Sequence, residues 1–362
     1  MRIALLVPTM EIGGVERVFV NLAHGLHECG AEVDLVVGRA GGPMGRFVGK
    51  DAQVFDLESD RMLKSVPRLA KYLRTREPEA LIAGMTHSSA AALLARALTR
   101  RKTKIIATEH TMMSWVCAHN SQLKYRLMPL WSHWVFNSAD YVVAVSAGLT
   151  DDLSTQTGIP PDRFRVIYNP VISDEIYATA AAPLEHPWFQ SGEPPVILAV
   201  GRLDGQKDFP MLIRAFRHIR DRRPSRLVIL GEGSDRSRIE NVVHELGLTE
   251  DVALPGAEPN PYRFMNRAAA FALSSESEGF GVVLVEALAL GLPVVSTNCA
   301  SGPAEILCDG EYGALVPTGD HEAMARALLC ALDGPVRRDN SQHVRQFTIR
   351  SVASKYISLI SN

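Results

Sequence analysis

Residues 274–305 read SSESEGFGVVLVEALALGLPVVSTNCASGPAE, and this stretch decides the fold class of the chain. The pattern predicts a polar loop, then an apolar helix from Val282 to Leu290, then a short buried strand from Val294 to Thr297. Gly291 and Pro293 end the helix, and a second glycine-bearing loop follows the strand. Loop, helix and strand in this order predict one repeat of an α/β fold.

Glu286 interrupts the predicted helix, which is otherwise apolar. A buried carboxylate is costly unless it is paired or hydrogen-bonded. Glu286 lies eight residues after Glu278 of the polar loop, and the amides of Phe280–Val282 form the positive end of the helix, which favours phosphate oxygens. Amides for phosphates and a carboxylate for a ribose diol together suit a nucleoside diphosphate. A helix cap plus a core glutamate held by backbone groups is the structural alternative.

Residues 278–295, EGFGVVLVEALALGLPVV, resemble the motif of the retaining glycosyltransferases of family 4, in which two glutamates are separated by seven residues. The resemblance implies the GT-B fold, an α/β architecture of two Rossmann-like, doubly wound parallel-sheet domains that face each other across a cleft. It further implies a nucleotide-sugar-dependent enzyme of the type found in bacterial polysaccharide and glycolipid assembly.

Length and composition agree with a two-domain globular protein. The chain has 362 residues, 46% hydrophobic and 22% charged, which is enough for two substantial cores. Its five cysteines form no Cys-x-x-Cys pair, and the apolar N-terminal run is cut short at Glu11. These features predict a cytoplasmic protein without a disulfide framework or signal peptide, and no nucleic-acid partner is expected.

Within residues 61–104, 11 basic residues stand against two acidic ones, an excess of nine positive charges. Clustered Lys and Arg attract anionic lipid headgroups. This segment therefore predicts peripheral contact with an anionic membrane, on the inner face of the cell membrane, and a glycan or lipid-linked acceptor. A solvated helix face is the alternative explanation of the charge.

The N-terminal half begins with an apolar strand from Arg2 to Pro8, a glycine turn and a helix from Val15 to Leu26. Gly13 and Gly14 in the turn do not form GxGxxG, so the dinucleotide fingerprint is absent. On pattern alone the pair is a tight turn. In the resembled family a Gly-Gly loop at this place approaches the donor phosphates and the acceptor.

The strand Lys104–Thr111 ends in Glu109 and His110. Ligands collect at the carboxyl ends of strands in open α/β sheets, although a lone histidine there is usually structural. The resemblance implies that His110 faces the donor sugar, and it assigns no role to Glu109. The stretch 112–137, rich in Trp, Met and Leu, predicts core helix for most of its residues, or else the border of a lipid surface or hydrophobic acceptor.

A linker is predicted at 173–195, which is rich in Ala and Pro and shows no regular period. It separates an acceptor-binding domain (1–172) from a nucleotide-sugar-binding domain (196–345). The resemblance implies that a C-terminal helix (346–362) packs back on the first domain.

In the second half, GRLDGQKDF places Arg202 and Lys207 in a loop after the strand Val196–Val200. A guanidinium fork and an ammonium five residues apart suit a diphosphate, whereas ordinary surface charge is the alternative. This loop resembles one whose Arg and Lys neutralise the leaving diphosphate in family 4.

The remaining site residues follow from the resemblance. Gly231 and Gly233 border the nucleoside, Pro255 and Gly256 lie near the base, and Glu286 holds the ribose diol. Glu278 binds hydroxyls of the donor sugar together with the amides of Gly279, Phe280, Gly281 and Val282.

No pattern for a metal site occurs, and His110, Arg202, Lys207 and Glu278 are predicted to carry a metal-independent, retaining hexosyl transfer from a UDP-sugar. The transferred sugar is a hexose or N-acetylhexosamine. Ser301-Gly302-Pro303 replaces the double Gly that is usual in the family's corresponding loop. The alternatives are a nucleotide-sugar epimerase on the same fold and a non-enzymatic two-domain sugar-binding protein.

Overall fold

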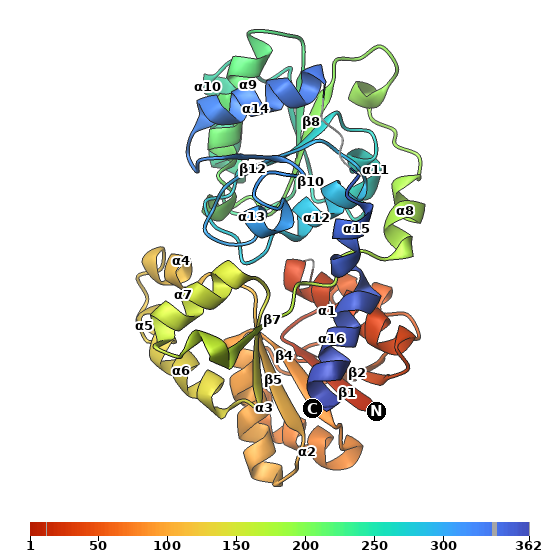
Figure 1. Cartoon of the computed structure of the whole chain (residues 1–362), viewed down its shortest axis with the longest axis vertical. Coiled ribbons are helices and arrows are strands. Elements are labelled where there is room, and N and C mark those ends of the chain that lie inside the picture. Colours follow the sequence, from red (N-terminus) through yellow and green to blue (C-terminus); the bar gives the residue numbers. More distant parts are fainter. Residues whose placement is uncertain (12, 335–338, 362) are drawn as a thin grey trace. The chain divides into compact units, whose positions relative to one another are not determined.

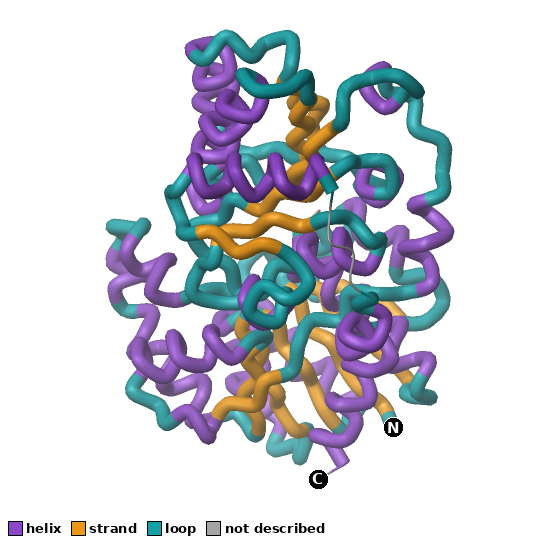
Figure 2. The backbone as a smooth tube through the Cα atoms, turned by 45° about the horizontal axis from the view of Figure 1, so that its top comes forward, coloured by secondary structure: helices purple, strands orange, loops and turns teal. Residues whose placement is uncertain are grey.

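The chain folds into two compact units, of which the first holds residues 1–171 together with the chain from 346 onward, and the second holds 172–345. Figure 1 labels their elements, and Figure 2 shows the strands of each sheet with helices packed around them. The computed structural model describes residues 1–11, 13–334 and 339–361.

The first unit is built on a seven-stranded parallel sheet in the order β3-β2-β1-β4-β5-β6-β7. Its strands are β1 (Arg2–Val7), β2 (Glu32–Val37), β3 (Gln53–Asp56), β4 (Ala80–Gly84), β5 (Lys104–Glu109), β6 (Tyr141–Ala144) and β7 (Phe164–Val166). Its helices are α1 (Gly14–Glu28), α2 (Val66–Arg76), α3 (Thr86–Thr99), α4 (Met113–Ala118), α5 (Leu123–Arg126), α6 (Met128–Ser138), α7 (Ala147–Thr157) and α16 (Ile349–Ser361).

The second unit is built on a six-stranded parallel sheet in the order β10-β9-β8-β11-β12-β13. Its strands are β8 (Val196–Val200), β9 (Arg226–Leu230), β10 (Val252–Gly256), β11 (Ala270–Leu273), β12 (Val294–Thr297) and β13 (Ala314–Val316). Its helices are α8 (Asp174–Ala180), α9 (Phe209–Arg220), α10 (Arg236–Glu245), α11 (Tyr262–Met265), α12 (Val282–Ala289), α13 (Pro303–Ile306), α14 (His321–Asp333) and α15 (Ser341–Val344).

Both sheets reverse their strand order once, between β1 and β4 in the first unit and between β8 and β11 in the second. At such a reversal the connections leave in opposite directions, and a crevice opens beyond the carboxyl ends of the two strands. The two α/β sheets confirm the predicted fold class.

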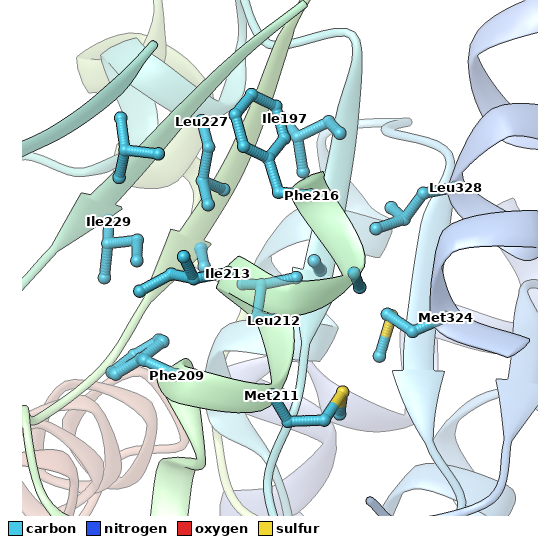
Figure 3. Close-up of a cluster of buried hydrophobic side chains, with 14 of the residues drawn as sticks. Ile197, Phe209, Met211, Leu212, Ile213, Phe216, Leu227, Ile229, Met324 and Leu328 are labelled. Carbon is cyan, nitrogen blue, oxygen red and sulfur yellow. The ribbon is translucent and has the colours of Figure 1, made fainter. Parts of the chain in front are cut away.

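The core of the second unit forms where α9 and α14 pack against each other and on the sheet (Figure 3). Phe209, Ile213 and Phe216 are spaced three and four residues apart, so they share one face of the helix. Full burial of each such side chain contributes about 1.5–3 kcal/mol to stability. Strand residues Ile197, Leu227 and Ile229 and the α14 residues Met324 and Leu328 complete this cluster.

Two parts of the chain differ from the sequence-based expectation. Residues 173–195 contain α8, which packs against α11 inside the second unit, so this segment is more than a linker. The core-helix interpretation of 112–137 is wrong for most of the aromatic and aliphatic residues that suggested it. The segment breaks into α4, α5 and α6, and of those residues Phe136 is buried whereas Leu123, Leu127, Leu130, Trp131 and Trp134 are exposed.

The last helix, α16, packs against α1 in the first unit, and the two lie side by side in Figure 1. Near its end, the Ile360 carbonyl accepts a hydrogen bond of 2.7 Å from Lys104 Nζ at the start of β5. The first unit is therefore completed by a helix that follows the second unit in the chain.

Candidate active site

The reversal point of the second sheet carries the two charged groups that the sequence singled out in separate motifs. Lys207 ends the short 3-10 turn η5 (Gly205–Lys207) that follows β8, and Glu278 lies in the loop that follows β11. Because β8 and β11 are hydrogen-bonded neighbours, the two loops emerge side by side.

Lys207 Nζ donates a hydrogen bond of 2.5 Å to Glu278 Oε1, and Ser275 Oγ donates one of 2.6 Å to the same oxygen. The loops are also joined through their backbones. Ser274 Oγ donates to the Lys207 carbonyl at 2.7 Å, and Gln206 Nε2 donates to the Ser277 carbonyl at 2.7 Å. The carboxylate and the ammonium are therefore held in place before any ligand arrives.

Arg202, the other predicted cation of this loop, is disposed differently. Its side chain is 76% exposed, and its Nε lies 3.4 Å from Asp204 Oδ2. An exposed guanidinium with one such contact can turn toward an anion at little cost in packing. Lys207 is thus the fixed cation of the loop and Arg202 the adjustable one.

Glu286 is buried, with 3% of its surface exposed, and its Oε1 accepts a hydrogen bond of 2.9 Å from the Tyr262 hydroxyl. Tyr262 begins α11 and is itself buried. The predicted buried carboxylate in the α12 helix is therefore confirmed. The tyrosine that satisfies it lies 24 residues earlier in the chain.

The loop ahead of α12 is clamped by residues 301–302. Gly281 caps the helix with a φ of +104°, and the buried Ser301 hydroxyl donates a 3.0 Å hydrogen bond to the Gly279 carbonyl. A Cβ on Gly302 would lie 1.8 Å from the Phe280 carbonyl oxygen. The glycine of Ser-Gly-Pro is therefore required by close approach, whereas the serine supplies a hydrogen bond that glycine could not make.

The glycines after β9 pack against the loop after β8. A Cβ on Gly231 would lie 1.9 Å from the Gly201 carbonyl oxygen, so this position also requires glycine. The Gly231 amide donates to the Gly256 carbonyl at 2.9 Å, which joins the ends of β9 and β10. Gly233 lies against the Leu203 backbone, and Pro255 is exposed on β10. These four predicted nucleoside-side residues line up along the carboxyl ends of adjoining strands.

In the first unit, Gly13 and Gly14 begin α1 after the loop that follows β1. Gly13 is the N-cap and Gly14 is exposed. The Glu16 carboxylate lies against Gly13 and accepts a hydrogen bond of 3.2 Å from Thr9 Oγ1. The turn therefore has a carboxylate at the positive end of α1, where a negative charge is favoured.

His110 follows β5, and its environment assigns the tautomer of its ring. Thr108 Oγ1 donates to the Ala83 carbonyl at 3.1 Å, so its lone pairs accept from His110 Nε2–H at 2.9 Å. Nδ1 is then left as the buried acceptor of the ring. Burial lowers the pKa of His110 to about 4, although Asn169 opposes the shift. The ring is neutral at pH 7 and offers a lone pair.

Comparison with known proteins assigns both units. Residues 12–175 match the family described as Glycosyltransferase Family 4, and residues 185–346 match the family described as Glycosyl transferases group 1. The chain belongs to the GT-B glycosyltransferases.

Named relatives of this glycosyltransferase act on lipid-linked and lipopolysaccharide sugars. An N-acetylgalactosamine-N,N'-diacetylbacillosaminyl-diphospho-undecaprenol 4-alpha-N-acetylgalactosaminyltransferase of Campylobacter jejuni is 33% identical over 67% of this chain, but the match spans only 64% of that protein's length. The lipopolysaccharide core biosynthesis glycosyltransferase LpsE of Rhizobium meliloti is 28% identical over 97% of this chain and 96% of its own.

Among solved structures, the fold of this glycosyltransferase is similar to that of Anabaena HepE in complex with UDP and glucose. The TM-score is 0.80 and the identity 19%, and the match covers 100% of both chains. At this identity the likeness shows the fold alone.

One buried carboxylate of the glycosyltransferase was given no role from the sequence. Glu109 is 2% exposed, and its Oε2 accepts hydrogen bonds from the Thr86 hydroxyl (2.7 Å) and amide (3.3 Å). Its Oε1 accepts from the His110 amide at 3.0 Å. Burial raises the pKa of Glu109, and these hydrogen bonds oppose the shift. A lone acid ending an apolar strand, KIIATE, was the signal that could have revealed it.

The positive charge of residues 61–104 is partly neutralised in the folded glycosyltransferase. Four of its arginines form ion pairs, and three of their four partners lie outside the segment. The pairs are Arg68–Glu58, Arg76–Asp34, Arg96–Asp140 and Arg101–Glu77.

Two features are absent from the described part of the chain. It contains no group of three or more His, Cys, Asp or Glu side chains placed to hold a metal ion. Nor is any of its helices long and apolar enough to cross a membrane.

Proposed function

We propose that this chain is a retaining, metal-independent glycosyltransferase that moves a hexose or N-acetylhexosamine from a UDP-sugar to a glycan or lipid-linked acceptor. The observation that carries the proposal is the Lys207–Glu278 pair at the sheet reversal of the second unit, directly ahead of α12. The match to two glycosyltransferase families supports it, whereas the epimerase and sugar-binding alternatives gain no support from those matches.

The departing UDP carries the charge that the enzyme has to stabilise. Lys207 has three donors, of which one is engaged by Glu278, so the same ammonium can also reach a phosphate oxygen. Arg202 is exposed and can close on the diphosphate as a planar fork. The N-terminus of α12 adds the partial positive charge of the helix. Fixed charge of this kind is the usual largest contribution to catalysis when a negative charge develops.

The donor's ribose and sugar would be held by the carboxylates and the neutral histidine. Glu286 binds the ribose diol while Tyr262 orients it. Glu278 accepts from hydroxyls of the transferred sugar, and His110 Nδ1 accepts from another of its hydroxyls. Because Glu278 is already bonded by Lys207 and Ser275, it is poorly placed to act as a nucleophile, and we assign retention to a short-lived oxocarbenium-like species.

The acceptor and location are proposed from the relatives. The Campylobacter relative is named for a diphospho-undecaprenol acceptor and the Rhizobium one for lipopolysaccharide core biosynthesis. We therefore propose a cytoplasmic enzyme with peripheral contact to an anionic membrane.

The test is a thermal-shift panel of UDP, GDP, ADP and their sugar conjugates on the wild type and on Glu286→Ala. A nucleotide at a hundredfold excess over its Kd stabilises the native protein by about 2.7 kcal/mol. We expect a shift with the UDP series that Glu286→Ala loses. No shift with any nucleotide would contradict the proposal, and a β-linked product from an α-linked donor, seen by NMR, would contradict retention.

A further inference from the structure

The exposed apolar surface of the described chain is concentrated in one short stretch. Of its twelve exposed large hydrophobic side chains, five lie between residues 123 and 134. The two most exposed of all twelve are Leu130, at 72%, and Leu123, at 67%. Scattered single hydrophobic residues are normal on a protein surface, but a cluster indicates an interaction site.

The geometry of α6 explains why these side chains face outward. Ser132, Val135 and Phe136 are buried and share one face of the helix, which packs toward α3 and α7. Leu127, Trp131 and Trp134 recur at the same helical spacing on the other face and are exposed. The helix is thus apolar on its outer face as well as its inner one. Trp131 and Trp134 contact each other there, with ring centroids 5.2 Å apart.

Charge complementarity indicates what covers this surface. No Asp or Glu occurs between Glu109 and Asp140, whereas Lys124 and Arg126 are both exposed within the cluster. Lys124 Nζ lies 4.6 Å from the centre of the Tyr125 ring, which keeps the ammonium beside the apolar side chains. The other titratable side chains between Glu109 and Asp140 are His110, His119, His133, Cys117 and Tyr125. The charged side chains of this surface are therefore all positive, and it suits an anionic partner.

Leucine and tryptophan side by side with Lys and Arg, on short helices, is the composition of segments that lie in the headgroup region of a bilayer. The basic segment at 61–104 is the competing candidate for this contact. Four of its arginines are in ion pairs, so its positive charge is already partly neutralised within the protein.

We propose that α5 and α6 form the surface through which the enzyme docks on an anionic lipid bilayer. Leu123, Leu130 and Trp131 enter the headgroup region, and Lys124 and Arg126 contact the lipid phosphates. This inference deepens the membrane contact of the proposed function and rests on it, but it moves that contact from 61–104 to 123–134.

The experiment is flotation of the purified full chain with vesicles of phosphatidylglycerol and phosphatidylcholine, and with phosphatidylcholine alone. Leu123→Gln/Leu130→Gln removes apolar contact at two exposed positions. Its matched control is Leu63→Gln/Leu98→Gln, which changes two exposed leucines of 61–104. Lys124→Gln/Arg126→Gln is likewise paired with Lys71→Gln/Arg74→Gln, also at exposed positions.

We expect the variants of α5 and α6 to lower partitioning into anionic vesicles roughly tenfold and the matched controls to leave it unchanged. Brominated lipid should quench the tryptophan fluorescence of the wild type. That quenching should be lost in Trp131→Phe/Trp134→Phe, while this variant still floats.

Three outcomes would overturn the inference: loss of flotation only in the 61–104 variants, absence of flotation of the wild type, or a dimer that Leu123→Gln/Leu130→Gln dissolves without any lipid binding. The UDP thermal shift is measured on the same proteins. Docking that fails while the UDP shift remains refutes the surface alone, whereas loss of the UDP shift in the wild type refutes the transferase.

Discussion

The Lys207 ammonium and the Glu278 carboxylate lie 2.5 Å apart although 71 residues separate them in the chain. Adjacent strands β8 and β11 deliver them to the same point. Both side chains are largely shielded, with 18% of Lys207 and 9% of Glu278 exposed. Such a pair contributes to the stability of the fold and, in the proposed function, to catalysis. Variants can separate these two contributions.

Removing one partner leaves the other charge shielded and without its counter-ion. We expect Lys207→Ala to lower the free energy of unfolding by about 1–3 kcal/mol, and Glu278→Gln to lower kcat/KM roughly a hundredfold. The double variant Lys207→Met/Glu278→Leu should recover stability but not activity, since it removes both charges together. Denaturant titration and initial rates measure the two effects.

The exposed pair Arg217–Asp221 on α9 is the control for that experiment. Its alanine variants should change stability by no more than about 0.5 kcal/mol. A Lys207/Glu278 double variant whose loss of stability equals the sum of the two single losses would show that the two residues are not coupled.

Glu286 should discriminate ribose from deoxyribose. We expect the wild type to bind UDP at least about tenfold more tightly than 2'-deoxy-UDP, because 2'-deoxy-UDP lacks one of the two ribose hydroxyls that donate to Glu286 in the proposed complex. Glu286→Ala should bind both nucleotides weakly and equally. Tyr262→Phe loses the 2.9 Å hydrogen bond to Glu286, so its preference for UDP over 2'-deoxy-UDP should be weaker than that of the wild type but stronger than that of Glu286→Ala. Isothermal titration measures the affinities, and a Glu286→Ala enzyme that still prefers UDP would place the ribose elsewhere.

The buried histidine predicts a pH dependence of stability. Burial lowers the pKa of His110 to about 4 in the folded state, whereas an unfolded histidine titrates near 6.5. Between these values the unfolded chain binds more protons, so the contribution of His110 is fully present above pH 6.5 and is lost as the pH falls toward 4. The loss should reach about 3 kcal/mol.

The comparison of wild type with His110→Gln isolates this effect, because Glu109, whose pKa is raised by burial, titrates in both proteins. Unfolding free energies between pH 4 and 7 should fall less steeply with acid in His110→Gln. Parallel curves for the two proteins would mean that His110 is charged or exposed in the folded state.

Gly302 should tolerate no side chain. Its φ is +89°, and a Cβ would lie 1.8 Å from the Phe280 carbonyl oxygen, so alanine there has to displace the loop that precedes α12. Gly291 is the matched control, because its φ is +75° and a Cβ there would meet nothing within 4 Å. We expect Gly291→Ala to cost about 1–2 kcal/mol from backbone strain alone.

Gly302→Ala should cost more than Gly291→Ala and should also raise the KM for the donor. Thermal unfolding and donor kinetics on both variants measure these effects. An unchanged donor KM in Gly302→Ala would show that the contact of Gly302 with the loop ahead of α12 does not affect donor binding.

The sequence predicts the repeating architecture well because each strand and helix carries its own pattern. The bounds of β8 and β12 agree with the prediction to the residue, and α12 ends one residue earlier than expected. Glu286 could be predicted to be buried because it is one carboxylate in an otherwise apolar helix. Patterns of this kind are local, so a single sequence reveals them.

The pairings could not be predicted, since they depend on which strands become neighbours. Lys207 and Glu278 meet only because the sheet order sets β8 beside β11. Arg76 and Arg96 are neutralised by Asp34 and Asp140, which lie outside the segment whose charge was counted. The exposure of Trp131 was missed for a similar reason: apolar composition does not reveal which face of a helix the rest of the chain leaves uncovered.

The position of α16 against α1 bears on the order in which the molecule is made. A ribosome releases β1 to β7 first, then the whole of the second unit, and only then the helix that covers α1. The second unit is continuous in the chain and can fold during translation, whereas the first unit waits for α16 with one face of α1 bare. Synthesis of α16 is therefore the step that completes the N-terminal unit, and a premature stop after residue 345 would leave its earliest-made helix without its cover.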